Sequence, residues 1–159
     1  MSATVVLGLG NSLLSDDASG LMIVQKLREL VSDPEIEFKT SEKVGLNLIE
    51  LVEGYDRAII IDSIITGRHP PGTVLEFSME TLPGTPRLRC PHDADFKSAI
   101  ELARQVGIKM PEKITIFGIE IIDNLTFRQN ISPELSCKFP SILQALVHKL
   151  HLTGLRLKN

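Results

Sequence analysis

Short apolar blocks alternate with amphipathic blocks along the whole chain, and this alternation predicts the secondary structure. Five blocks have the length and apolar content of β-strands, at residues 5–7, 36–40, 58–61, 73–77 and 113–119. The block at 58–61 is apolar throughout, as expected of a central strand covered on both faces. Helical patterns separate most of these blocks, which favours an α/β domain.

Four amphipathic segments predict helices. They cover residues 15–31, 46–52, roughly 93–107 and 132–150. Ser15 or Asp16 is expected to cap the first helix, because both residue types are favoured at that position. Ser132 followed by Pro133 is a typical start signal for the last helix. Cys137, inside this last segment, is expected to be a small buried apolar residue.

One connection predicts the direction of the fourth strand. Residues 66–72 have the Pro and Gly content of a turn and lead directly into the block at 73–77. A parallel crossover usually needs a dozen or more residues, so this strand should run antiparallel to the others. Right-handed crossovers among the first three strands give the partial order 2-1-3. The sequence therefore predicts one α/β domain, residues 1–159, as a three-layer sandwich with a mostly parallel five-stranded sheet.

Acidic residues and one histidine are predicted at the same edge of this sheet. Asp16 and Asp17 follow the first strand, Asp62 ends the third, and His92 precedes the third helix. Ligands of such sheets bind beyond the carboxyl ends of the strands, where the winding reverses. Two carboxylates and an imidazole suit nickel, zinc or manganese with open coordination positions. Each residue also has a structural alternative, as a helix cap or strand end.

Composition argues against nucleic-acid and membrane partners and against secretion. The net charge is −3, which gives no indication of a nucleic-acid-binding face. No apolar run approaches the 18 or so residues of a membrane span, and the N-terminus lacks the basic stretch of a secretory signal. Two cysteines are too few for a disulfide scaffold. We therefore expect a cytoplasmic protein with neither nucleic-acid nor membrane partners.

Three common enzyme motifs are absent. The third glycine of a dinucleotide fingerprint beginning at Gly8 would fall on Leu13, and acids at 16 and 17 would repel a pyrophosphate. There is also no P-loop and no Gly-x-Ser-x-Gly elbow. No nucleotide cofactor is expected. Cys90 lies two residues before His92, which leaves a thiol–imidazole pair as a further possibility.

The segment GLGNSLLSDD at residues 8–17, with Gly20 beyond it, resembles the opening motif of hydrogenase maturation proteases. These are the C-terminal endopeptidases of nickel–iron hydrogenase large subunits. The resemblance continues in order over nearly the whole chain. It includes residues 45–48, 60–63, 91–92, 117–120 and 125–135.

The resemblance implies a sheet order of 2-1-3-5-4 with the fourth strand reversed. It also places the family's metal-contacting and catalytic positions on Asp17, Asp62 and His92. The implied activity is removal of the C-terminal tail from a large-subunit precursor, with the precursor carrying the nickel. A carboxylate, Asp16 or Asp17, is the candidate general base of such an aspartyl-type endopeptidase.

Two departures from the family pattern keep alternatives open. The family usually has Glu where this chain has Asp17, and an Asp-Gly-Gly-Thr-like segment where this chain has residues 40–44, Thr-Ser-Glu-Lys-Val. Side chains in place of glycines fill and charge a surface that would otherwise allow close backbone approach. The alternatives are a binding or chaperone member that does not cleave, and a metal-dependent hydrolase of small molecules.

Overall fold

The structure is a computed structural model that describes residues 3–43, 45–82 and 96–152. Its strands are β1 (Thr4–Leu9), β2 (Ile36–Ser41), β3 (Arg57–Ile64), β4 (Val74–Ser78) and β5 (Lys113–Glu120). Its helices are α1 (Ser19–Leu30), α2 (Ile49–Val52), α3 (Phe96–Gln105) and α4 (Pro133–Leu152). Short 3₁₀ turns, η1 (Ser15–Ala18) and η2 (Gly45–Leu48), precede α1 and α2.

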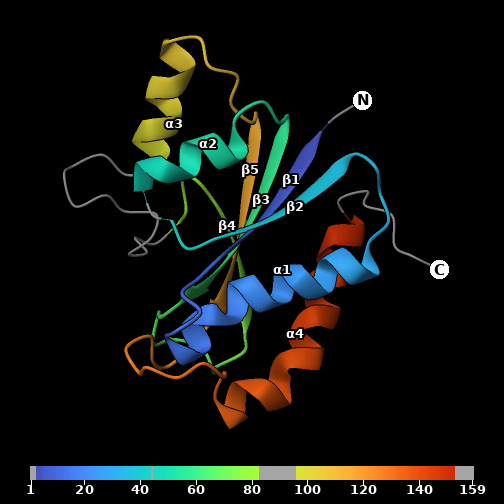
Figure 1. Cartoon of the computed structure of the whole chain (residues 1–159), viewed down its shortest axis with the longest axis vertical. Helices are drawn as coiled ribbons and strands as arrows, with labels where there is room; N and C mark the ends of the chain where they lie inside the picture. Colours follow the sequence, from blue (N-terminus) through green and yellow to red (C-terminus); the bar gives the residue numbers. More distant parts are fainter. Residues whose placement is uncertain (1–2, 44, 83–95, 153–159) are drawn as a thin grey trace.

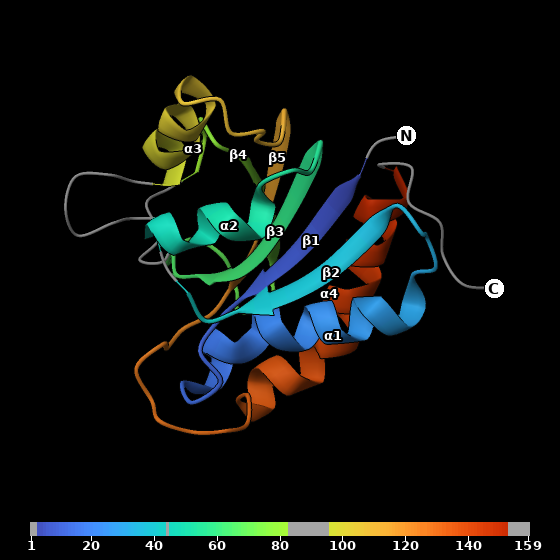
Figure 2. The same cartoon turned by 45° about the horizontal axis from the view of Figure 1, so that its top comes forward.

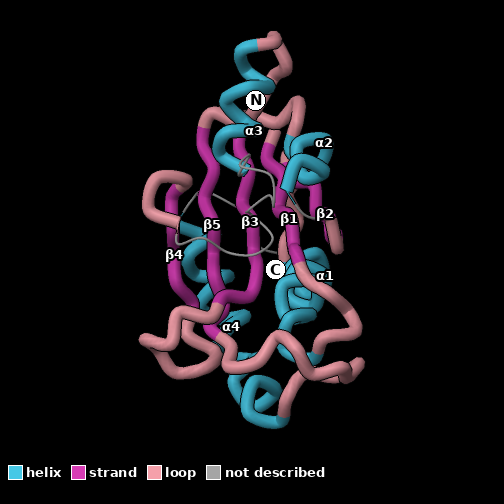
Figure 3. Tube along the Cα trace, turned by 90° about the vertical axis from the view of Figure 1, so that its left-hand side faces the viewer, coloured by secondary structure: helices cyan, strands magenta, loops and turns pink. Residues whose placement is uncertain are grey.

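The five strands form one sheet in the order β2-β1-β3-β5-β4, which Figure 3 shows side by side. All neighbouring pairs are parallel except β4 with β5, which is antiparallel. The predicted fold class and the reversed fourth strand are therefore confirmed. The reversal follows from the short connection after β3, which leaves no room for a crossover helix.

Helices cover both faces of the sheet, with α1 and α4 on one side and α2 and α3 on the other (Figures 1 and 2). Successive residues of β3 point to opposite faces, as in any strand. Ile59 and Ile61 belong to the core beneath α1 and α4, and Ala58 and Ile60 belong to the core on the α2 side. Among the described residues, none of the helices is long and apolar enough to cross a membrane.

The start of α1 lies against the sheet because the chain has glycine where the two approach most closely. A Cβ at Gly20 would lie 2.2 Å from the carbonyl oxygen of Leu9 and 2.6 Å from that of Ile61. A Cβ at Gly8 would lie 2.4 Å from the carbonyl oxygen of Gly20. These glycines therefore serve helix–strand packing, and they hold η1 beside the end of β3.

Two local expectations were wrong. Neither Ser15 nor Asp16 caps the first helix, because both lie inside η1, and no side chain caps η1 or α1. Cys137 is exposed on α4 instead of buried. The expected start of the third helix, near Asp93 or Asp95, lies outside the described residues, as does Cys90.

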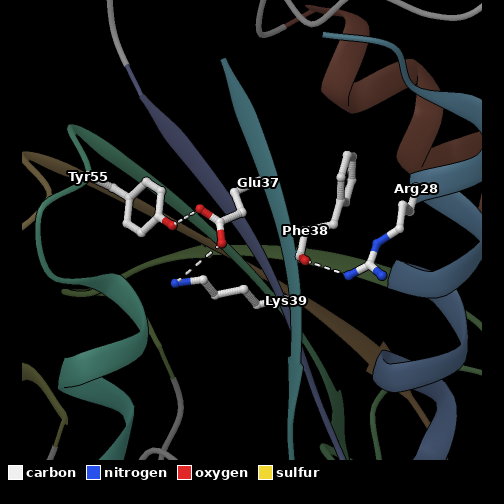
Figure 4. Close-up of polar contacts among 5 residues, drawn as sticks. All are labelled: Arg28, Glu37, Phe38, Lys39 and Tyr55. Atoms are coloured by element: carbon white, nitrogen blue, oxygen red, sulfur yellow. Dashed lines mark hydrogen bonds and ion pairs between the residues drawn. The ribbon is translucent and has the colours of Figure 1, made fainter. Parts of the chain in front are cut away.

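Side chains from both layers hold the edge strand β2 (Figure 4). Arg28 on α1 donates a hydrogen bond from Nη2 to the carbonyl oxygen of Phe38, at 2.6 Å. The hydroxyl of Tyr55 donates to Glu37, and the ammonium of Lys39 lies 4.9 Å from the centre of the Tyr55 ring. Burial, and secondly the hydrogen bond to Glu37, raise the pKa of Tyr55. The segment that follows β2 is thereby held near the loop after β1.

Candidate active site

The loop after β1 is attached to the loop after β5 at the carboxyl edge of the sheet. The N–H of Ser15 donates to the carbonyl oxygen of Arg128 at 2.8 Å, and the N–H of Arg128 donates to that of Leu13 at 2.9 Å. Ser15 has a φ of 48°, in the left-handed region, and its hydroxyl donates to the carbonyl oxygen of Asn130 at 3.1 Å. These contacts fix the position of the acids that come next in the chain.

Asp16 anchors the first turn of α4. Its Oδ1 accepts from the N–H of Ser132 at 2.6 Å, and its Oδ2 accepts from the Ser132 hydroxyl at 2.9 Å. That hydroxyl in turn accepts from the N–H of Leu135 at 3.2 Å, as an N-cap residue does. The predicted start signal at Ser132 is confirmed, and both oxygens of Asp16 are used to hold it.

Asp17 and Asp62 are brought together through one residue, Ser63. The Ser63 hydroxyl donates to Oδ1 of Asp17 at 2.6 Å, and the Ser63 N–H donates to Oδ1 of Asp62 at 2.8 Å. The exposed fractions of the three residues are 3% for Asp17, 2% for Asp62 and 7% for Ser63. Two acids 45 positions apart in the sequence thus lie in one buried hydrogen-bonded group.

The third predicted site residue, His92, lies outside the described residues. Within the described ranges, no group of three or more His, Cys, Asp and Glu side chains is arranged to hold a metal ion. The metal-binding and catalytic roles of Asp17, Asp62 and His92 therefore stay predictions. Two other histidines, His69 and His148, have exposed side chains.

Sequence reasoning assigned no role to Glu120, which is 1% exposed at the end of β5. One carboxylate oxygen accepts from the N–H groups of Thr66 and Gly67, at 2.8 and 3.0 Å, and the other accepts from the Thr66 hydroxyl at 2.7 Å. Glu120 therefore shapes the turn that follows β3. An acid directly after an apolar run was the available signal, since Asp62 follows the apolar run of β3 in the same way.

The segment that departs from the family pattern lies beside the loop after β1. The Glu42 carboxylate accepts from the N–H of Ser12 at 2.6 Å, and the carbonyl oxygen of Ser41 accepts from the N–H of Gly10 at 3.3 Å. The Glu42 side chain and the Ser41 backbone thus contact the loop that leads to Asp17. Val44, the last residue of the segment, lies outside the described residues.

The family model described as hydrogenase maturation protease matches residues 22–149. This chain belongs to the hydrogenase maturation protease family. The hydrogenase 2 maturation protease of Escherichia coli K12 is 28% identical over 153 residues, which cover 94% of this chain and 92% of the relative. The resemblance seen in the opening motif is therefore confirmed over nearly the whole chain.

Solved structures agree with this assignment. A hydrogenase maturating endopeptidase from E. coli matches with a TM-score of 0.77 and 25% identity, over 98% of this chain and 96% of that one. A [NiFe] hydrogenase maturation protease from Thermococcus kodakarensis has a TM-score of 0.62 at 18% identity, covers 92% and 91%, and shows the shared fold. As a maturation protease, this chain is a peptide hydrolase that acts in hydrogenase processing.

Proposed function

We propose that this protease removes the C-terminal tail of a nickel–iron hydrogenase large-subunit precursor after nickel has been inserted. In this proposal Asp17, Asp62 and His92 contact the nickel that the precursor carries. The observation that supports it is the buried pair of carboxylates joined by Ser63 at the carboxyl edge of the sheet. Ligands of open α/β sheets bind at this edge.

The chemistry of the two acids suits a metal ion brought by the substrate. Buried carboxylates are costly unless they are hydrogen-bonded or paired with positive charge, and a metal ion supplies such charge. Carboxylate and imidazole groups are ligands that nickel accepts. Contact with the precursor's nickel would tell the protease whether the metal is present before the tail is cut. Asp17 is the proposed general base for the attacking water.

The rim of the site suits a polypeptide substrate. Leu125 and Phe127, on the loop after β5, are 77% and 83% exposed, and Leu13 is 52% exposed. Asp123 orders this loop by accepting hydrogen bonds from the N–H of Leu125 and the hydroxyl of Thr126. Large apolar side chains held out into solvent on an ordered loop are typical of a surface that a protein partner covers.

The test is mass spectrometry of a purified large-subunit precursor before and after incubation with this protein. The nickel-loaded precursor is expected to lose a C-terminal peptide, and the same precursor prepared without nickel is expected to keep its full mass. Equal cleavage of both forms would contradict recognition through nickel. Binding without any loss of mass would instead support the non-cleaving alternative.

A second measurement addresses the small-molecule hydrolase. Elemental analysis of the purified protein is expected to find little stoichiometric metal, because in this proposal the nickel belongs to the precursor. One tightly held zinc per chain, together with hydrolysis of small amides or esters without a protein partner, would favour an autonomous metallohydrolase.

A further inference from the structure

We infer that Ser63 is a positioning residue that holds Asp17 and Asp62 in one fixed arrangement. The inference deepens the proposed function, on which it rests, by adding a residue that need not touch the substrate. Its basis is geometric, because a single residue donates to both acids. Its backbone N–H binds Asp62 at 2.8 Å, and its hydroxyl binds Asp17 at 2.6 Å.

The sheet explains why a residue at this position can reach both acids. Neighbouring residues of β3 point to opposite faces, so Asp62 continues the row of Ala58 and Ile60, and Ser63 continues the row of Ile59 and Ile61. That second row faces α1 and η1, which carries Asp17. The pairing of β1 with β3 ends at Gly8 and Ile61, so Ser63 lies beyond the end of β1.

The Ser63 hydroxyl is well placed to fix the Asp17 carboxylate. An O–H···O⁻ bond of 2.6 Å is in the range of charge-assisted hydrogen bonds, which are roughly twice as strong as neutral ones. Both residues are buried, so solvent competes little for the same oxygen. Without the hydroxyl, the Asp17 carboxylate loses this donor and is held less firmly relative to Asp62. Outer-shell partners of this kind typically contribute 10- to 100-fold to activity.

The experiment compares three substitutions of Ser63 in the precursor-shortening assay. Ser63→Ala removes the hydroxyl and should slow shortening of the nickel-loaded precursor by about 10- to 100-fold. Ser63→Thr keeps the hydroxyl and should restore most of the rate. Ser63→Cys keeps the volume but replaces the hydroxyl with a weak donor, so it should be about as slow as Ser63→Ala.

Ser19→Ala is the matched control, because Ser19 is also fully buried and its hydroxyl has no hydrogen-bond partner within the described residues. It should retain the wild-type rate. Circular dichroism establishes that each variant is folded. Wild-type rates for folded Ser63→Ala or Ser63→Cys, or a folded Ser63→Thr as slow as Ser63→Ala, would overturn the positioning role.

A double-mutant cycle separates failure of this inference from failure of the proposed function. Unfolding equilibria are measured for the wild type, Ser63→Ala, Asp17→Ala and the double variant. The two changes should be coupled by about tenfold in the unfolding equilibrium constant, and simple additivity would overturn the inference. This result does not depend on activity. If the wild type fails to shorten any precursor, the proposed function is wrong, and the cycle still decides whether Ser63 holds Asp17.

Discussion

Acidic side chains have different surroundings at the two ends of the strands, the carboxyl ends and the amino ends. At the carboxyl ends, Asp16, Asp17, Asp62 and Glu120 are buried and accept hydrogen bonds from hydroxyl and N–H donors. At the amino ends, Asp56 is only half-buried and lies beside Lys109, with Oδ1 and Nζ 2.6 Å apart. A pocket of about 600 Å³ also lies toward the amino edge, between α3, the end of β4 and the start of β5. An exposed ion pair is screened by water and adjustable, while buried acids are fixed in position. Acids fixed in position are what the proposed contact with the precursor's nickel requires.

The buried acids at the carboxyl ends of the strands fall into two groups. Asp16 and Glu120 each use both carboxylate oxygens to hold neighbouring chain segments, the start of α4 and the turn after β3. Asp17 and Asp62 instead meet at Ser63. Burial alone therefore does not identify a functional acid, and the partners of each carboxylate separate the structural acids from the candidate catalytic ones.

The largest expected effect comes from testing one acid at each edge. Asp62→Asn should lower the rate of tail removal by more than about 100-fold, beyond the range of outer-shell partners, because the amide removes the charge that is proposed to contact nickel. Glu112→Gln, in the amino-edge pocket, should leave the rate unchanged. His92→Ala should be as inactive as Asp62→Asn. Precursor mass at timed intervals measures all three, and normal processing by Asp62→Asn and His92→Ala would refute the assigned roles.

The next largest effect is expected from a substitution at the contact between α1 and the sheet. Gly20→Ala should lower the free energy of unfolding by roughly 3 kcal/mol, the upper end of overpacking effects, because its Cβ would press on two backbone oxygens that cannot rotate away. Urea denaturation followed by circular dichroism measures the loss. A variant as stable as the wild type would show that α1 can move away from β1 at little cost.

A smaller effect distinguishes Asp16 from the catalytic candidates. Asp16→Ala leaves the N–H and hydroxyl of Ser132 without their acceptor, so the free energy of unfolding should fall by about 2 kcal/mol. The rate per folded molecule should stay well above that of Asp62→Asn. Urea denaturation and the processing assay on the same preparation measure both quantities. Loss of activity without loss of stability would place Asp16 in the chemistry.

The smallest effect concerns Asp56 at the amino edge. The hydrogen bond from Lys109, and secondly that from the N–H of Ala3, lower the pKa of Asp56 in the folded chain. A lowered folded pKa means that the contribution to stability is present above the unfolded pKa and is lost as pH falls through the folded pKa. Asp56→Asn should therefore be slightly less stable than the wild type at pH 7, and the difference should vanish in strong acid. Thermal melts across this pH range provide the measurement.

Local patterns were enough to predict the sheet. The strand positions, the reversed β4 and the meeting of Asp17 with the end of β3 followed from apolar periodicity, one short connection and the handedness of crossovers. The contacts that decide what each acid does were not predictable in this way. Asp16 meets a partner 116 positions away, and the Asp17–Ser63 hydrogen bond spans 46 positions. Which of two neighbouring acids turns toward which partner depends on the 3₁₀ geometry of η1, where a helix cap was expected instead.

The hydrogen bond from Arg28 to Phe38 affects whether copies of this protease can associate through β2 in concentrated solution. The carbonyls of Glu35 and Ser41 accept hydrogen bonds from Thr4 and Gly10, on the β1 side, so by alternation the Phe38 carbonyl points away from the sheet. An unpaired outer strand can recruit a strand from another molecule. Here the outward-pointing Phe38 carbonyl of β2 already accepts a hydrogen bond from Arg28 of the same chain. This opposes the addition of a strand from another copy to β2.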